Sequence, residues 1–374
     1  MRVICLGRFC DDLPGGIEAH VVSLLETLQD RVDFVHLVPS RDGKSARFVK
    51  GGVPVVRTAS WNVDGSLALS PGLILETWRQ YRQQGCDLVH LHFPGPMSHL
   101  ASMVIPAHVP RVITWHADIT RQRRLLKLYE PWQRAILRQA RAIIVATPEH
   151  LKSSAALSIA GIRQKVRVIP YGFELSRFVA PQAEAARIRQ RHPGRLIFAV
   201  GRHVHYKGFS VLLEALQKLA PDVQLILGGE GLLTPDLQAQ ARALGLADRV
   251  HFPGLIPDAM LPAYYQACDV FCLPSVNQAE AFGIVQVEAM AAGKPVVSSA
   301  LGNGVDFVNR HGLTGLTAPP GDAGALAEAL ATLLGDEGLR LRLGHQARAR
   351  VLSEFSRAAM GERTLALYRE VLQH

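Results

Sequence analysis

Two carboxylates, with seven residues between them, stand in a segment that is otherwise almost entirely apolar. The segment EAFGIVQVEAMAAGKPVV begins at Glu280 and carries its second acid at Glu288. The pattern predicts a helix that starts near residue 282 and stops before Gly293 and Pro295. Glu280 then precedes the helix and Glu288 lies inside it. Taken alone, the segment fits either structural acids in a buried helix or a ligand site.

The chemistry that this spacing suits is the binding of a nucleotide-sugar. The first-turn amides have no partner inside a helix and attract anions, so a diphosphate could bind there. These amides belong to Phe282, Gly283, Ile284 and Val285. Carboxylates accept hydrogen bonds from sugar hydroxyls, so one acid would hold the transferred sugar and the other the ribose. We therefore expect the acids to bind two ends of one ligand rather than to form an acid–base pair.

A second segment, AVGRHVHYKGFSVLLEAL at 199–216, has two cations in a short loop between a predicted strand and a predicted helix. Arg202 offers a planar fork of donors and Lys207 a compact charge, and together they could hold a diphosphate. On this segment alone, two ordinary exposed cations are the simpler interpretation.

Two segments of the first half also follow predicted strands. Gly15 and Gly16 stand in DDLPGGIEAHVVSLL at 11–25, where backbone could approach a phosphate at the start of a helix. The segment does not match the dinucleotide fingerprint G-x-G-x-x-G. His116 and Asp118 follow the strand RVITWH, where open α/β sheets carry ligand contacts. A structural turn and a structural histidine are the alternatives.

The segment 112–134 continues with basic, leucine and aromatic side chains. Its basic residues are Arg121, Arg123, Arg124, Lys127 and Arg134, and its aromatic residues include Trp132. Such a mixture fits a helix that lies in a membrane interface. An ordinary amphipathic surface helix fits it equally well.

The charge of the chain is concentrated in its first half. The chain has 374 residues and a net charge of +9. Residues 1–170 hold 22 basic and 13 acidic residues, a balance of +9, whereas 171–374 hold 19 of each. This asymmetry indicates an anionic partner: phospholipid, a phosphorylated carrier or nucleic acid. The five scattered cysteines indicate cytosolic thiols, and no apolar run approaches the length of a membrane span.

The elements that must position these residues form two similar series. Continuous apolar runs alternate with helical patterns, from RVICLG to VRVIP and again from RLIFAVG to PVVSSA. This alternation predicts two doubly wound α/β halves with parallel sheets buried on both faces. The strandless segment 170–194, with three prolines, is interpreted as a linker. The final segment SRAAMGERTLALYREVLQ predicts a helix.

In this order, the segments resemble the retaining glycosyltransferases of family 4. EAFGIVQVE matches the E-x7-E signature, and the other matching pieces cover essentially the whole chain: PGGIE, TWHAD, IPYGF, VGRHVHYKG, LGGEG, RVHFPGLI and HGLTGLTAPPGD. The resemblance implies a GT-B fold, in which two Rossmann-like doubly wound domains face a central cleft. It implies an acceptor-binding domain over 1–172, completed by a helix over about 357–374, and a nucleotide-sugar-binding domain over 173–356.

The resemblance also implies a role for each candidate residue. His116 would lie beside the donor sugar, with Asp118 shaping the site, and Gly15 and Gly16 would approach the donor phosphate. Arg202 and Lys207 would neutralise the leaving diphosphate. Glu280 would bind the sugar hydroxyls and Glu288 the ribose. The backbone around Leu255 and Ile256 would meet the base.

The implied activity is transfer of a hexose from a nucleotide-sugar, with no cofactor. No D-x-D motif occurs, which fits an enzyme that needs no metal ion. The variant ALGNGVDFVNRHGLTGL is similar to bacterial mannosyl- and deoxyhexosyltransferase-like members of surface-polysaccharide assembly. The preferred donor is therefore GDP-mannose or a GDP-deoxyhexose such as GDP-rhamnose.

The expected acceptor is a saccharide or lipid-linked glycan of lipopolysaccharide or O-antigen synthesis. The expected location is cytoplasmic, peripheral on an anionic membrane surface at the inner face of the cytoplasmic membrane. The alternatives are a UDP-sugar donor, a GT-B nucleotide-sugar enzyme that transfers no sugar, such as an epimerase, and a non-catalytic binder. Nucleic-acid binding is not expected, because no recognised motif accompanies the basic charge.

Overall fold

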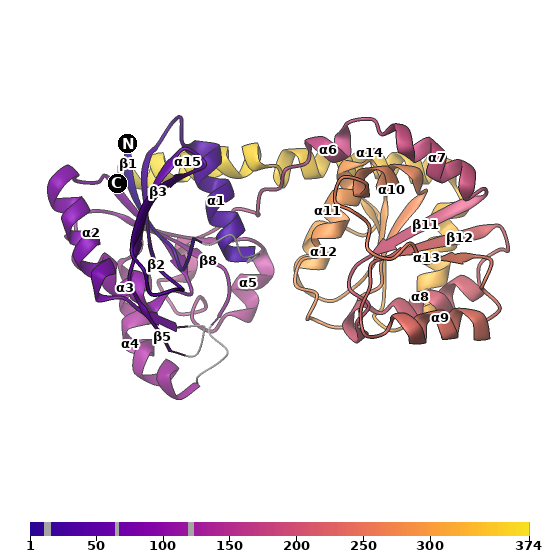
Figure 1. The fold of residues 1–374 in the computed structure, drawn as a ribbon, viewed down its shortest axis with the longest axis horizontal. Coiled ribbons are helices and arrows are strands. Elements are labelled where there is room, and N and C mark those ends of the chain that lie inside the picture. Colours follow the sequence, from indigo (N-terminus) through magenta and orange to yellow (C-terminus); the bar gives the residue numbers. More distant parts are fainter. Residues whose placement is uncertain (11–15, 64–66, 119–122, 374) are drawn as a thin grey trace. The chain divides into compact units, whose positions relative to one another are not determined.

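The computed structural model describes residues 1–10, 16–63, 67–118 and 123–373. It divides into two compact units, shown in Figure 1. The N-terminal unit comprises Met1–Phe173 and Arg357–His374, and the C-terminal unit comprises Glu174–Ser356. The chain thus leaves its first unit once and returns to it with its last helix.

The N-terminal unit is built on an eight-stranded sheet in the order β10-β9-β8-β7-β1-β2-β4-β3. Neighbouring strands are parallel, except that β3 runs antiparallel to β4. The strands are β1 (Arg2–Leu6), β2 (Asp33–Pro39), β3 (Ala46–Lys50), β4 (Val53–Thr58), β7 (Leu88–Phe93), β8 (Arg111–Trp115), β9 (Ala142–Val145) and β10 (Val166–Val168). A separate ribbon pairs β5 (Trp61–Val63) with β6 (Leu67–Leu69).

Both faces of this sheet are covered by helices, which explains the continuous apolar strands. In β1, Ile4 and Leu6 join one hydrophobic cluster, whereas Val3 and Cys5 join another, because successive side chains point to opposite faces. The first cluster includes residues of α2, α3 and α4, and the second includes residues of α1 and α15. The helices are α1 (Gly16–Leu28), α2 (Pro71–Gln84), α3 (Pro96–Ser102), α4 (Arg123–Gln139), α5 (Pro148–Ser153) and α15 (Arg357–Gln373).

The last helix, α15, is an integral part of the N-terminal unit. Gly361 brings it close to α1, since a Cβ there would lie 2.7 Å from Cγ2 of Thr27. The hydroxyl of Tyr368 lies 2.6 Å from Nδ1 of His90 on β7. Tyr368 is fully buried, so the helix contributes to the core rather than lying on the surface.

The C-terminal unit contains a parallel six-stranded sheet in the order β13-β12-β11-β14-β15-β16. The strands are β11 (Arg195–Val200), β12 (Val223–Gly228), β13 (Val250–His251), β14 (Val270–Leu273), β15 (Val296–Ser299) and β16 (Gly315–Ala318). The helices are α6 (Ser176–Val179), α7 (Ala183–Arg191), α8 (Phe209–Gln217), α9 (Thr234–Ala243), α10 (Leu261–Ala267), α11 (Ile284–Ala291), α12 (Gly304–Val308), α13 (Ala323–Gly335) and α14 (Glu337–Glu354). The prediction of two doubly wound α/β halves is confirmed.

The predicted linker at 170–194 is wrong in most of its length, because it contains α6 and α7. Both helices pack against α10 of the C-terminal unit. The side chain of Gln266 donates hydrogen bonds to the carbonyls of Phe178 and Ala180, at 3.0 and 2.7 Å. These bonds hold the start of the segment to its own unit, which its prolines alone did not reveal.

Each sheet has one point at which the strand order reverses. The reversal lies between β1 and β7 in the first sheet and between β11 and β14 in the second. Open α/β sheets bind ligands beyond the carboxyl ends of the strands at such switch points. Each unit therefore carries one position where candidate side chains should gather. Among the described residues, the structure holds no helix long and apolar enough to cross a membrane.

Candidate functional site

In the C-terminal unit, the structure brings Lys207 and Glu280 together at the switch point. Lys207 ends the short 3-10 helix (His205–Lys207) that follows β11, and Glu280 lies in the loop after β14. The Nζ atom of Lys207 is 2.6 Å from Oε2 of Glu280, which also accepts a bond from Ser275 Oγ at 3.1 Å. The Lys207 and Glu280 side chains are only 10% and 11% exposed. Burying two charges costs desolvation free energy, which the close contact of the pair and further hydrogen bonds must offset.

Close backbone contact fixes the two loops that carry this pair. Gly208 has a φ of 67°, and a Cβ there would lie 2.0 Å from the carbonyl oxygen of Pro274. The amide of Val276 donates to the carbonyl of Tyr206 at 2.8 Å. Glycine at 208 is therefore needed both for its left-handed backbone and for the approach of the two loops.

The variant segment ALGNGVDFVNRHGLTGL, at 300–316, supports the backbone of Glu280. Asn303 caps α12 in a capping box with Asp306. Its Nδ2 also donates to the main-chain oxygen of Glu280 at 2.8 Å. The variant segment thus holds the backbone of the acid that the sequence singled out.

The helix after Glu280 begins two residues later than predicted. α11 starts at Ile284, because Gly283 at the N-cap position has a left-handed φ of 69°. Phe282 and Gly283 therefore precede the helix, and Ile284 and Val285 supply its first amides. A Cβ at Gly283 would lie 2.6 Å from Leu273, so the strand end and the helix start are in close contact.

The other predicted cation, Arg202, is exposed in the same loop as Lys207. Its Nη2 lies 3.3 Å from the hydroxyl of Tyr206. The structure thus pairs Lys207 with Glu280 and leaves Arg202 at the surface end of the loop.

Glu288 lies inside α11, away from solvent for most of its surface. Tyr265 donates its hydroxyl to Oε2 at 2.7 Å, and Nη2 of Arg177 is 4.0 Å from Oε1. Burial raises the pKa of Glu288 above its ordinary value, while the Tyr265 bond and the Arg177 charge oppose that rise. Tyr265 is thus a hydrogen-bond partner of Glu288, the residue predicted to bind the ribose. The sequence did not indicate this partner.

Tyr265→Phe is expected to lower the free energy of unfolding of the C-terminal unit by about 1.5–3 kcal/mol, because a buried carboxylate loses its hydroxyl donor. Urea unfolding followed by far-UV circular dichroism measures the change. Tyr264→Phe is the matched control, since the described bonds of Glu288 do not include Tyr264. Equal stability of the two variants would contradict the assigned hydrogen bond.

A cavity of about 800 Å³ opens beyond β12 and β13. Leu255, predicted to meet the base, lines it and is 73% exposed. Ile256 packs over Gly228, where an added Cβ would lie 2.5 Å from its Cδ1. The cavity has room for a flat ring system beside the predicted base contacts.

In the N-terminal unit, His116 belongs to a cluster of aromatic and imidazole rings. It follows β8, and its Nε2 lies 3.2 Å from Nδ1 of His92 on β7. Its Nδ1 lies 3.1 Å from the hydroxyl of Tyr171. The ring of His20, on α1, has its centre 5.1 Å from that of His116. Burial is the main cause that lowers the pKa values of His92 and His116 well below 6.5, so both rings are neutral at pH 7.

The remaining predicted residues of this unit lie around the cluster. Asp118 accepts bonds from the indole of Trp115 and the hydroxyl of Ser154, both at 2.8 Å, so it orders the chain beside His116. Gly16 begins α1, and a Cβ there would meet no described atom within 4 Å. Gly15 lies outside the described residues.

The predicted interfacial segment is only partly described. Arg121 lies outside the described residues, and Arg123, Arg124 and Lys127 fall within the bounds of α4. Trp132, on the same helix, is 51% exposed.

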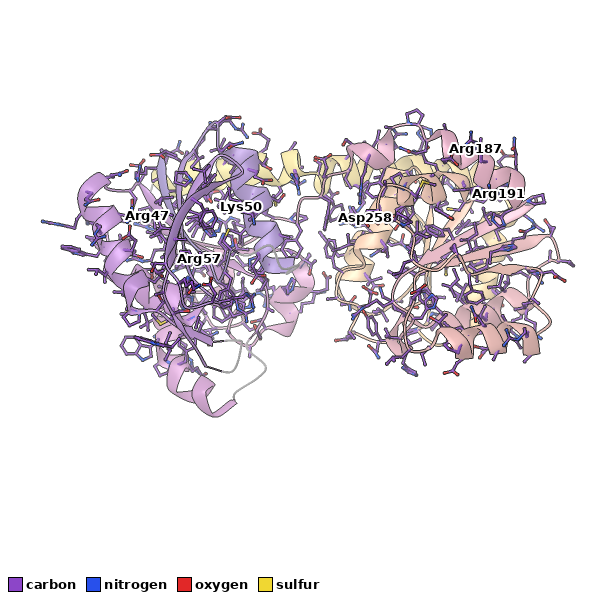
Figure 2. All side chains as sticks on the ribbon, in the orientation of Figure 1. Arg47, Lys50, Arg57, Arg187, Arg191 and Asp258 are labelled. Atoms are coloured by element: carbon purple, nitrogen blue, oxygen red, sulfur yellow. The ribbon has the colours of Figure 1, made fainter. Side chains whose placement is uncertain are left out.

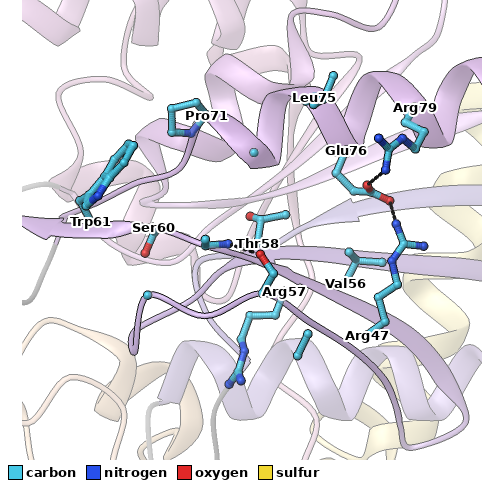
Figure 3. Close-up of a pocket in the computed structure, with 15 residues that line it drawn as sticks. Arg47, Val56, Arg57, Thr58, Ser60, Trp61, Pro71, Leu75, Glu76 and Arg79 are labelled. Carbon is cyan, nitrogen blue, oxygen red and sulfur yellow. Dashed lines mark hydrogen bonds and ion pairs between the residues drawn. The ribbon is translucent and has the colours of Figure 1, made fainter.

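A second basic region surrounds the outer edge of the N-terminal sheet. Arg47, Lys50 and Arg57 belong to β3 and β4 and are labelled in Figure 2. A cavity of about 740 Å³ lies between these strands and α2 (Figure 3). In Figure 3, Arg47 and Arg79 both reach Glu76, at 2.8 and 3.2 Å.

Apolar side chains flank this cavity. Trp61 and Leu75 line it while remaining 70% and 56% exposed. Guanidinium groups beside exposed apolar side chains suit a ligand or surface that is both anionic and apolar. The sequence reasoning did not single out this region.

The sequence reasoning also missed His20, His92 and Tyr171. Their only signal was position, since LVHLHF alternates histidine with apolar residues at the end of a buried strand and IPYGF follows another. Such histidines are indistinguishable from core residues until the strand order is known.

Comparison with known proteins matches both units. Residues 14–177 match the family described as Glycosyltransferase Family 4, and residues 182–350 match that described as Glycosyl transferases group 1. The chain is 34% identical to D-rhamnosyltransferase WbpZ of Pseudomonas aeruginosa, over 95% of this chain and 92% of that protein. It is 30% identical to O-antigen chain mannosyltransferase C of Escherichia coli, over 77% of this chain and 76% of that protein.

The fold is also that of solved structures. Anabaena HepE, solved in complex with UDP, matches with a TM-score of 0.76 at 22% identity, over 99% of this chain and 100% of that one. The family matches, the extent of the two sequence similarities and this fold together show that the chain belongs to glycosyltransferase family 4 and is a glycosyltransferase of the GT-B fold.

Proposed function

We propose that this glycosyltransferase moves mannose, or a deoxyhexose such as rhamnose, from a GDP-sugar with retention and without a metal ion. The observation that carries the proposal is the buried Lys207–Glu280 pair at the switch point of the second sheet. It offers a carboxylate for sugar hydroxyls beside an ammonium group for a diphosphate. The choice of sugar is supported by the names of the two relatives, a rhamnosyltransferase and a mannosyltransferase.

The proposed chemistry follows from the charges that develop. Cleavage of the sugar–phosphate bond leaves a diphosphate and an oxocarbenium-like sugar. Lys207, Arg202 and the first amides of α11 stabilise the diphosphate, and this preorganised charge takes the place of a divalent ion. The acceptor hydroxyl attacks the face that the diphosphate leaves, and the leaving oxygen takes its proton, so the configuration is retained.

GDP-mannose or GDP-rhamnose is expected to support transfer in the presence of EDTA, because the fixed cations replace the metal. Incubation with GDP-, UDP-, ADP- and dTDP-sugars, followed by NMR of the product, measures donor choice and anomeric configuration together. Transfer from UDP-sugars alone would contradict the proposed GDP-sugar donor. Loss of activity in EDTA would contradict metal independence, and an inverted product would contradict the proposed retaining mechanism. Donor turnover without any acceptor product would favour an epimerase.

The acceptor in this proposal is a saccharide or lipid-linked glycan of O-antigen synthesis, met at the cytoplasmic face of an anionic membrane. The excess of nine positive charges in residues 1–170 supports this location. So does the basic cavity of Figure 3, with exposed Trp61 beside it. The Escherichia coli relative, named for the O-antigen chain, supports the acceptor class.

Arg123→Glu combined with Arg124→Glu is expected to reduce binding to anionic liposomes at low salt, because two attractive charges become repulsive. Each basic residue near such a surface contributes about 1 kcal/mol, so a loss on the order of tenfold or more is expected. Arg187→Glu with Arg191→Glu, on α7 of the C-terminal unit, is the matched control (Figure 2). Cosedimentation measures binding; if the native chain never binds such liposomes, the membrane location is wrong.

A further inference from the structure

Three histidines of the N-terminal unit converge from three separate elements. His20 lies on α1, His92 on β7 and His116 just after β8. One ring nitrogen from each lies within 4.8 Å of the other two. Within the described ranges, these side chains form the one group of three or more His, Cys, Asp or Glu residues with that closeness.

The distance between two of these nitrogens already matches a metal site. Nδ1 of His92 and Nε2 of His116 are 3.2 Å apart. Two nitrogens bound tetrahedrally to zinc at about 2.0–2.1 Å stand about 3.3–3.4 Å apart. The His20 nitrogen lies within 4.8 Å of the other two, so the His20 side chain would move closer to complete a three-nitrogen set. A fourth position would remain for water.

The cluster also has the surroundings that such ligands need. The hydroxyl of Tyr171 holds the other nitrogen of His116 at 3.1 Å, as outer partners of metal-binding histidines do. Nδ1 of His20 is buried with no hydrogen-bond partner among the residues that the structure describes. A buried polar atom without a partner is uncommon and calls for a ligand or water.

The chemistry of the three groups selects the kind of ion. All three side chains offer imidazole nitrogens, which bind a metal ion in their neutral form. The set contains imidazole and no carboxylate. Imidazole suits zinc, cobalt, nickel and copper, whereas magnesium, calcium and manganese prefer oxygen.

We propose that His20, His92 and His116 form a binding site for one divalent transition-metal ion of the zinc class, and that occupancy of this site inhibits sugar transfer. The inhibitory part rests on the proposed function, because a bound ion takes His116 away from the donor sugar. The binding part does not depend on it. The proposed transfer reaction itself uses no metal, so the ion acts as an inhibitor and not as a cofactor.

Cobalt titration of the chelator-treated full chain tests binding directly. One equivalent of Co²⁺ is expected to produce the intense visible bands of tetrahedral cobalt, and Zn²⁺ is expected to displace it. His20→Ala and His92→Ala should lose these bands, and Tyr171→Phe should weaken binding by about 10–100-fold. His108→Ala, which removes an exposed histidine of the same unit, should leave binding unchanged.

Circular dichroism checks that each variant is folded. His20 is only half-buried, so His20→Ala keeps the test valid even where the loss of buried His92 unfolds the unit. Absence of tetrahedral bands in the native chain would overturn the site. Zinc affinity that is unchanged in folded His20→Ala would overturn it as well.

The inhibitory part is measured as the ratio of transfer rates with and without stoichiometric Zn²⁺. The native chain is expected to lose most of its activity and to regain it in EDTA, while His20→Ala should show a ratio near one. If zinc binds to the three histidines without slowing transfer, the proposed inhibition is wrong. His116 would then have no role in the transfer reaction. A chain with no transferase activity but an intact cobalt spectrum would contradict the proposed function and leave the metal site standing.

Discussion

Lys207→Ala is expected to lower the rate of sugar transfer by about 10²–10³, the usual cost of removing one preorganised electrostatic group. The ammonium group lies at the switch point of the second sheet, 2.6 Å from Glu280 and largely removed from water. In that environment its attraction for a developing diphosphate charge is much stronger than in bulk solvent. The steady-state rate with saturating donor measures the effect. Lys218→Ala removes an exposed lysine of the same unit and is the control.

The same substitution should destabilise the protein, and the two effects can be separated. Without Lys207 the carboxylate of Glu280 is buried without its cation, which costs about 3–5 kcal/mol in comparable cases. The double variant Lys207→Met with Glu280→Gln removes both charges and should recover most of that stability. Its transfer rate should stay low, because the charge that meets the diphosphate is still missing. Recovery of activity together with stability would contradict a catalytic role for this pair.

Acidification is expected to unfold the N-terminal unit before the C-terminal unit. Burial lowers the pKa values of His36, His90 and His99 from 6.5 to about 4, 3 and 3. Below pH 6.5 the unfolded chain binds protons that the folded chain excludes, so stability present above that pH is lost as pH falls towards 4. At pH 5 each of these histidines lowers the free energy of unfolding by about 2 kcal/mol relative to its value above pH 6.5. The sum, about 6 kcal/mol, is comparable with the whole stability of an ordinary domain.

The tryptophans make this prediction easy to measure. All four lie in the N-terminal unit, at Trp61, Trp78, Trp115 and Trp132. Tryptophan fluorescence should therefore change at a higher pH than the part of the far-UV circular dichroism signal that comes from the C-terminal unit. Coincident transitions would contradict the prediction.

A histidine variant tests the cause of this acid sensitivity. His36→Leu removes one buried titrating group and should reduce the loss of stability between pH 8 and pH 5 by about 2 kcal/mol. His108→Leu removes an exposed histidine and should leave that difference unchanged. Comparing two pH values for each variant cancels the effect of the substitution on packing.

The buried strands and the last helix were predictable because their patterns are strong. β1 and β11 contain continuous apolar runs, as expected for strands covered on both faces. The edge strand β3 alternates half-buried with exposed residues, and β16 lies in a glycine-rich segment, so neither carried that signal. The helices α6 and α7 were missed because their proline-rich flanks suggested a linker.

The candidate site was predictable as a set of segments but not as a set of contacts. Lys207 and Glu280 stand 73 residues apart, and only the strand order puts both at one switch point. Tyr265 reaches Glu288 from a different helix, which no local pattern reveals. His20 and His92 were indistinguishable from core residues until α1, β7 and β8 were seen to converge. The sequence alone shows which residue types follow each predicted strand. Which of these residues contact one another depends on the strand order.

The return of α15 to the N-terminal unit has a consequence for synthesis on the ribosome. The core of that unit includes Met360, Leu365 and Tyr368, which emerge only after all of Glu174–Ser356 has been translated. Domains generally fold as units, starting from the N-terminus as they emerge. Here the unit that is begun first is completed last, with one face of its sheet lacking α15 throughout translation of the other unit. While Glu174–Ser356 is translated, the part of that sheet face that α15 later covers stays exposed, and this apolar surface is a natural target for chaperones.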